Sequence, residues 1–229
     1  MPAPETAAPD LAVAGLRVEA GGRTILDIPA LTVPAGAMLV LRGASGAGKS
    51  TALNVLSGNL AASAGQVRWG GTDIAGLSPA GRRRFRRERL GLIFQDYRLF
   101  AELGALDNAA LAAAWMPRAR RPALRAAAVA ALDRLGLGAA ADRRVAVMSG
   151  GERQRVAMAR ALATAPSAIL ADEPTASLDR ANADRLADDL AALAGPRTVV
   201  VVSHDPAVQA RASRVITLAD GRIVEDSDA

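Results

Sequence analysis

The chain has 229 residues, 51% of them hydrophobic, which is enough to bury a substantial core and excludes an intrinsically disordered protein. Its 28 Lys and Arg outnumber its 23 Asp and Glu for a net charge of +5, and the absence of cysteine excludes disulfides and thiol chemistry. No apolar run approaches the roughly 18 residues of a membrane-spanning helix and the start does not resemble a secretory signal, so we expect a soluble, intracellular chain.

Strand-like and helical segments alternate along the chain. The strands are predicted from short apolar or β-branched runs bounded by turn residues: 11–18, 24–33, 37–41, 67–69, 90–94, 168–171, 198–202, 215–218 and 223–224. The helices are predicted at 49–57, 78–88, 150–164 and 180–193, and in an Ala/Leu-rich stretch, 106–137, that Pro117 and Pro122 interrupt. This order predicts an α/β fold with a mostly parallel sheet and an antiparallel β part near the N-terminus.

The two ends of the chain differ from the rest in composition. Residues 1–10, MPAPETAAPD, are predicted to be a flexible leader, and the closing EDSDA a frayed acidic tail. We therefore expect a single folded domain over 11–226, followed by a tail at 227–229.

A glycine-rich segment, GASGAGKS at 43–50, lies between the predicted strand at 37–41 and the helix that begins at Lys49. It fits G-x-x-x-x-G-K-[ST], in which glycines let backbone N–H groups curve round a phosphate and the helix N-terminus adds positive potential. The strand–loop–helix context argues against the alternative of an ordinary glycine-rich turn. The predicted nucleotide-binding residues here are Gly43, Ala44, Ser45, Gly46, Ala47, Gly48, Lys49, Ser50 and Thr51.

Two side chains of this loop have individual roles in the prediction. Lys49 is the only lysine among the 28 basic residues, which indicates a place that needs a compact ammonium group, and it would reach the β- and γ-phosphates. The Ser50 hydroxyl would ligate Mg²⁺.

Polar side chains also follow two other buried-type strands. Asp172 and Glu173 come directly after 168–171, where one carboxylate can hold Mg²⁺ through a water and the next can act as general base toward an attacking water. His204 comes just after 198–202 and can hydrogen-bond a γ-phosphate. An acidic turn and a core histidine are the ordinary interpretations. Parallel strands end at one edge of a sheet, however, so we expect these side chains to meet the phosphate loop in a nucleotide-hydrolysing site.

These motifs, with the MSGGE that begins at Met148 and the RQRVAMARAL that follows it, resemble the ATP-binding cassette (ABC) family of transporter ATPases. Ser149 and Glu152 by themselves form an S-x-x-E capping box at a helix start. The resemblance implies a further use: the signature residues of one subunit close on the γ-phosphate held by the phosphate loop of a second copy. Glu152 replaces the consensus glutamine, a variation that the family tolerates. The signature residues expected to bind nucleotide are Ser149, Gly150, Gly151 and Glu152.

The resemblance assigns roles to three more residues. Gln95 resembles the Q-loop glutamine, which contacts Mg²⁺ and the attacking water and senses the membrane partner. Asp179, in Ser-Leu-Asp, resembles the D-loop residue that communicates between subunits, and His204 resembles the switch histidine. The match covers about 11–224. It implies a P-loop NTPase core with an inserted helical subdomain at about 97–165, ATP and Mg²⁺ as cofactors, and a head-to-tail dimer.

Two longer segments, LSPAGRRRFRRERLGLIFQDYRLF and GALDNAAL, are similar to the cassettes of lipoprotein-releasing and macrolide-exporting systems and to a cell-division cassette. This implies an ATPase that powers integral membrane permease subunits from the cytoplasmic face of the inner membrane, as a peripheral subunit. The alternative within this group is the ATPase of a mechanotransmission complex that controls a periplasmic enzyme without moving cargo. A third interpretation is a soluble cassette for DNA repair or translation. Such proteins usually have two cassettes or long coiled-coil insertions, and this sequence has neither.

The basic stretch RRRFRRER at 82–89 has two interpretations. The favoured one is a solvated helix whose arginines pair with acidic neighbours. In the other, the stretch binds an anionic surface such as a membrane leaflet. We expect no nucleic acid as partner, because Phe85 is the only aromatic residue interleaved with the arginines.

One departure from the family concerns the nucleotide base. The family usually stacks adenine on an aromatic residue some distance before the phosphate loop. The equivalent place in this chain is Ala20, and no aromatic residue precedes Trp69. We therefore expect adenine to be held by apolar packing from a residue such as Val18 or by the plane of Arg23, with GTP competing better than usual.

Overall fold

The computed structural model describes residues 7–228. Most of the predicted leader, 1–6, and residue 229 of the predicted tail lie outside the described residues.

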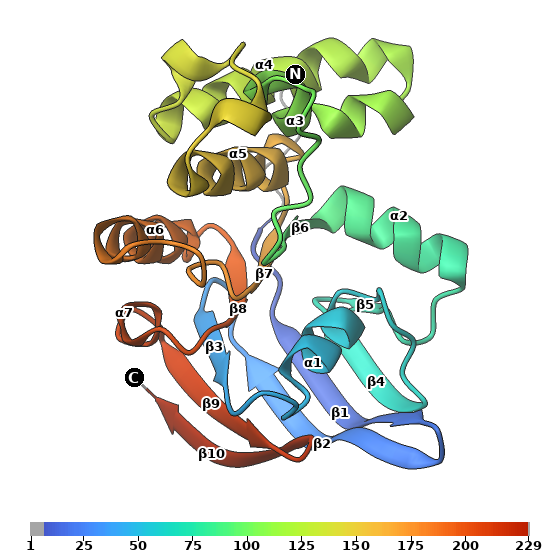
Figure 1. Cartoon of the computed structure of the whole chain (residues 1–229). Helices are drawn as coiled ribbons and strands as arrows, with labels where there is room; N and C mark the ends of the chain where they lie inside the picture. Colours follow the sequence, from blue (N-terminus) through green and yellow to red (C-terminus); the bar gives the residue numbers. More distant parts are fainter. Residues whose placement is uncertain (1–6, 229) are drawn as a thin grey trace.

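Two β-sheets form the larger part of the molecule (Figure 1). One is antiparallel, in the order β2-β1-β4-β5, and the other has the order β10-β9-β3-β8-β7-β6, in which β10 alone is antiparallel to its neighbour. The α/β fold with a mostly parallel sheet and an N-terminal antiparallel part is thereby confirmed. The strands are β1 (Leu11–Ala20), β2 (Arg23–Val33), β3 (Met38–Arg42), β4 (Ala64–Trp69), β5 (Thr72–Asp73), β6 (Leu90–Ile93), β7 (Ala168–Asp172), β8 (Thr198–Val202), β9 (Arg214–Ala219) and β10 (Arg222–Asp228).

Helices cover the sheets and form a separate layer at the top of Figure 1. The α-helices are α1 (Lys49–Leu56), α2 (Pro79–Arg89), α3 (Ala105–Ala109), α4 (Arg121–Arg134), α5 (Gly150–Ala163), α6 (Arg180–Leu193) and α7 (Pro206–Gln209). Short 3-10 turns lie at Leu111–Trp115, Arg118–Arg120, Gly138–Ala140 and Val145–Val147. No helix in the described part of the chain is both long enough and apolar enough to cross a bilayer.

The central strands are buried on both faces, which is why they are continuous apolar runs without alternation. In β3, Leu39 and Leu41 pack with α1 and the antiparallel sheet, whereas Met38 and Val40 pack with α6 and α7 on the opposite face. All five residues of β8 are buried. This strand lies between β3 and β7, so three strand ends lie side by side.

A third apolar cluster joins α3, α4 and α5 and is distinct from the two clusters that flank the sheet. Alanines at close approach points, such as Ala128 and Ala131 of α4, are fully buried there. On this basis we propose that the segment predicted at about 97–165 is a helical subdomain.

Two local predictions differ from the structure. Pro122 does not interrupt a helix but occupies the first turn of α4, where the missing N–H of proline has no partner to lose. The closing acidic residues are not frayed from Glu225 onward, because β10 pairs with β9 as far as Asp228.

Candidate functional site

The phosphate loop connects the C-terminal end of β3 to α1, as its sequence predicts. Gly43 needs a glycine for two reasons: its φ is 146°, and a Cβ would lie 2.2 Å from the Leu218 carbonyl oxygen. Gly48 occupies the N-cap of α1 in the left-handed region, with φ 95°. The backbone of the loop therefore curls tightly between β9 and the start of α1.

The start of α1 presents unused hydrogen-bond donors. In the described residues, the N–H groups of Gly48, Lys49, Ser50 and Thr51 donate to no protein acceptor. The Lys49 ammonium donates to the carbonyl oxygens of Gly43 at 2.7 Å and Ala44 at 2.8 Å, so it folds back across the loop. Free N–H groups at a helix N-terminus together with one ammonium form an anion site of the kind that holds phosphate.

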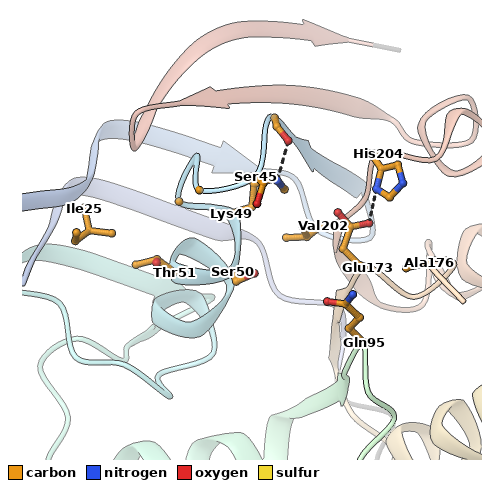
Figure 2. Close-up of a pocket in the computed structure, with 13 residues that line it drawn as sticks. Ile25, Ser45, Lys49, Ser50, Thr51, Gln95, Glu173, Ala176, Val202 and His204 are labelled. Carbon is orange, nitrogen blue, oxygen red and sulfur yellow. Dashed lines mark hydrogen bonds and ion pairs between the residues drawn. The ribbon is translucent and has the colours of Figure 1, made fainter.

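A cavity of about 490 Å³ opens over this loop (Figure 2). Among the predicted residues, its lining includes the loop backbone, Gln95, Glu173 and His204. The side chains of Ala44 and Ala47 are not part of the lining, since Ala47 is buried beneath the loop and Ala44 faces outward. The full lining is Ile25, Gly43, Ser45, Gly46, Gly48, Lys49, Ser50, Thr51, Gln95, Glu173, Ala176, Val202 and His204.

Glu173 and His204 meet at the edge of this cavity. The Glu173 Oε2 lies 2.9 Å from His204 Nδ1, and the glutamate side chain is 15% exposed whereas the imidazole is 72% exposed (Figure 2). Glu173 has φ 43°, an uncommon left-handed conformation for a residue with a side chain, and its N–H donates to the Val202 carbonyl at 2.9 Å. The strand ends of β7 and β8 therefore position this pair toward the phosphate loop.

Ser50 and Asp172 form the second polar contact of the site. The Ser50 hydroxyl donates to Asp172 Oδ1 at 3.4 Å. Burial raises the pKa of the Asp172 carboxyl, against the opposing influence of the Ser50 hydrogen bond and of the Lys49 and Arg98 charges. A partly buried carboxylate beside a hydroxyl is a suitable half-set of oxygen ligands for a divalent cation.

These oxygens do not make a complete cation site by themselves. Nowhere in residues 7–228 do three or more His, Cys, Asp or Glu side chains converge as metal ligands. Mg²⁺ is normally bound through one or two carboxylates plus phosphate oxygens and waters, so Ser50, Asp172 and Gln95 fit a magnesium ion that arrives with nucleotide phosphates.

The signature segment lies outside the cavity. Ser149 caps α5, its Oγ accepting from the Glu152 N–H at 3.2 Å while Glu152 Oε2 accepts from the Ser149 N–H at 2.8 Å. Gly151 lies against Asn182, to whose Oδ1 a Cβ would come within 3.1 Å. Asp179, the N-cap of α6, accepts from both Asn182 nitrogens, and these hydrogen bonds hold its pKa below the usual range. One chain thus carries the phosphate loop and the signature at separate places.

Comparison with known proteins decides the family. A family model described as "ABC transporter" matches residues 26–176. The chain belongs to the ABC transporter family. It is an ATP-binding cassette and an ATP hydrolase, as the resemblance implied.

Several relatives are similar over most of this cassette. A lipoprotein-releasing system ATP-binding protein, LolD of Chromohalobacter salexigens, is 41% identical over 89% of this chain and 86% of its own length. A macrolide export ATP-binding/permease protein, MacB of Rhodospirillum rubrum, is 43% identical over 88% of this chain but only 31% of its own length. The chain therefore spans about a third of the MacB relatives that it matches.

A solved cassette has the same fold. The dimeric post-hydrolysis state of the cassette MJ0796, bound to ADP and Pi, has a TM-score of 0.84 and 30% identity, covering 95% of this chain and 98% of that one.

The residues expected to contact the adenine base differ from those that line the cavity. Val18 is buried against the core at 5% exposure, so the prediction that it packs on adenine is wrong. Ile25, 37% exposed, lines the cavity instead and lies at the end opposite His204 (Figure 2). Val18 pairs with Leu26 across β1 and β2, so strand alternation turns Ile25, the neighbour of Leu26, to the opposite face of the sheet. This depends on the pairing of the two strands, which the sequence alone does not give. Arg23 is exposed but does not line the cavity, so its role stays a prediction.

Proposed function

We propose that this cassette hydrolyses Mg²⁺-bound ATP in a site shared between two copies of the chain. The observation that carries the proposal is the 2.9 Å contact between Glu173 and His204, which faces the free N–H groups at the start of α1 across one cavity. Glu173 acts as general base toward the attacking water, and His204 orients it and contacts the γ-phosphate. Lys49 binds the β- and γ-phosphates, while Ser50, Asp172 and Gln95 hold the cation.

The second half of the site comes from a second copy. The signature, 149–152, is absent from the cavity lining of its own chain, although the capped start of α5 is a suitable phosphate-binding end. The structurally similar cassette MJ0796 has been solved as a dimer. In a head-to-tail dimer the signature of each copy would close on the γ-phosphate held by the other, and Asp179 would lie near the junction.

Replacing Glu173 with glutamine tests the proposal. The Glu173→Gln variant should bind ATP with unchanged affinity, lose turnover by at least about a hundredfold, and accumulate as an ATP-bound dimer, because general-base catalysis contributes roughly 10²–10⁴-fold. Binding is measured by equilibrium titration, turnover by phosphate release, and mass by light scattering. Near-normal hydrolysis by this variant would show that another group is the base.

We further propose that the dimer powers an exporter or a lipoprotein-releasing complex as a peripheral subunit on the cytoplasmic face of the inner membrane. The likeness to LolD and MacB supports this role. A groove of about 530 Å³ beside the Gln95 segment, lined by α2 arginines and by Phe94 and Trp115, provides a surface for a permease segment. Trp115 is 67% exposed. Arg83, Arg86 and Arg87 along the same groove favour an occupant with both apolar and acidic side chains.

A further inference from the structure

Glu152 places a negative charge at the N-terminal end of α5. Its carboxylate is held at that end, since Oε2 accepts from the Ser149 N–H at 2.8 Å and Oε1 from Arg143 Nη1 at 2.8 Å. The glutamate side chain is 21% exposed, and it is the acidic residue of the first turn of α5. A neutral glutamine at this place could still accept from the Ser149 N–H through its amide oxygen, but its amide nitrogen could not accept from Arg143.

A negative charge at this place opposes the proposed binding of a phosphate by the N-terminal end of α5. If the signature closes on the γ-phosphate of a second copy, the carboxylate comes near an anion as water leaves the interface. Like charges repel more strongly as the surrounding dielectric falls, so an uncompensated Glu152 would weaken closure.

Arg143 is held in place to compensate this charge. Its N–H donates to the Ala140 carbonyl at 3.0 Å, and its own carbonyl accepts from the Ala105 N–H at 3.0 Å. Its Nη2 also donates to the Val147 carbonyl at 3.4 Å. The backbone and guanidinium contacts together fix the cation beside Glu152, although the arginine side chain is 47% exposed.

We infer that Arg143 is a positioning residue of the shared site, which neutralises Glu152 so that the signature of one copy can close on the ATP bound by the other. The inference rests on the proposed function of the signature. Closure would bury the ion pair, and removing one partner of a buried pair leaves a lone charge in the interface, a larger penalty than losing an exposed pair.

The test uses the full chain in a Glu173→Gln background, so that ATP is not consumed, and measures the monomer–dimer dissociation constant by sedimentation with ATP and Mg²⁺. Arg143→Ala and Arg143→Gln should each weaken ATP-dependent dimerisation by at least about tenfold. Adding Glu152→Gln to either variant should restore dimerisation to within about threefold of the parent. Arg144→Ala, the matched control, removes the same charge one residue away and should change dimerisation by less than about twofold, because Arg144 makes no ion pair with Glu152 among the described residues.

Two further readouts separate this role from a structural one. ATP affinity of the diluted monomer should stay close to the parent in the Arg143 and Arg144 single variants, since Arg143 is outside the cavity of its own chain. Their thermal unfolding midpoints should fall by no more than about 3 °C, because the Arg143–Glu152 pair is partly exposed in the monomer. Unchanged dimerisation in Arg143→Ala, or a loss that Glu152→Gln does not rescue, would overturn the inference. Failure of the parent Glu173→Gln chain itself to dimerise with ATP would instead overturn the shared site, and the inference would fall with it.

Discussion

Asp172 and Glu173 are adjacent in sequence but have different surroundings. Asp172 ends β7 and points toward Ser50, whereas Glu173 turns into the left-handed region and reaches His204. A left-handed backbone at a residue with a side chain costs of order 1 kcal/mol and persists where the surrounding structure enforces it. Here the Glu173 N–H bond to Val202 enforces it, so the two consecutive carboxylates point in different directions, one toward Ser50 and the other toward His204.

The raised pKa of Asp172 leads to a stability prediction. Because burial raises the pKa, the folded chain favours the protonated carboxyl, and the stability that this provides is lost as the pH rises through the raised pKa. Asp172→Asn should therefore raise the unfolding midpoint of the nucleotide-free chain at pH 7.5 by about 1–3 °C, a small value because the group is partly solvated.

Differential scanning fluorimetry across pH 4.5 to pH 7.5 checks this, because a raised pKa moves the titration of Asp172 above the ordinary carboxyl pKa of about 3.9. The advantage of the asparagine variant should shrink toward the acidic end. A variant that is equally destabilised at every pH would contradict the assignment of burial as the dominant cause.

The position of Ile25 in the cavity lining predicts weak selectivity between nucleotide bases. An aliphatic side chain contacts a base through nonspecific apolar area and reads none of its polar edge, so we expect the Michaelis constants for ATP and GTP to agree within about threefold. Ile25→Tyr should lower the Michaelis constant for both nucleotides by about fivefold, because aromatic stacking adds roughly 0.5–1.5 kcal/mol. Steady-state kinetics with both nucleotides measures this, and a large preference of the unmodified chain for ATP would count against it.

At the scale of elements, α5 serves two purposes. Its capping box satisfies the backbone N–H groups of Ser149 and Glu152, and the same residues belong to the proposed signature. Ser78 caps α2 in a comparable way, with its Oγ accepting from the Gly81 N–H at 3.2 Å, but α2 carries no signature. The pair of caps allows the two roles to be separated.

Ser149→Ala should cost about 1 kcal/mol of stability and also reduce hydrolysis by at least about tenfold, while the isolated subunit still binds ATP. Ser78→Ala should cost a similar amount of stability with hydrolysis by the isolated chain unchanged. Urea unfolding and phosphate-release assays on both variants give the comparison. Equal activity of the two variants would show that Ser149 is a cap only.

The sequence predicted most elements to within a few residues, because each depends on local pattern. The bounds of α6 and β8 match the predictions, since an N-cap at Asp179 and a run of valines are local signals. The length of β10 was missed, because Glu225 and Asp226 are poor strand formers that are held by long-range contacts with Arg42 and Arg214. Tertiary pairing overrode local propensity there.

At the scale of the whole molecule, we expect the membrane partner to bind in the arginine-lined groove between α2 and the helical layer. Two arginines of α2 bond to carbonyls, Arg82 to Leu77 at 2.7 Å and Arg86 to Gly58. In the described part of the chain, the expected pairing of these arginines with acidic neighbours is limited to the contacts that two others make with Glu88. Positive charge therefore remains along a groove that also exposes Trp115. Such a surface suits a partner segment of complementary charge.

The tagged chain, purified from its native membranes, should retain a multi-spanning protein, and Trp115→Glu should reduce that retention by at least about tenfold through repulsion and lost apolar contact. ATPase activity of the isolated variant should be unchanged. Recovery of the chain bound to DNA or ribosomes, with no membrane protein, would contradict the transporter role.

The phosphate loop, the Asp172–Glu173 pair and the apolar strands could be predicted from the sequence alone, because glycine conformation, strand–loop–helix order and continuous burial are local consequences of residue type. The tertiary structure decided which of these side chains meet. It alone turned Glu173 toward His204, buried Val18 and exposed Ile25 to the cavity, and paired Arg143 with Glu152. Those contacts depend on strand register and on packing between segments far apart in the chain, which no local pattern determines.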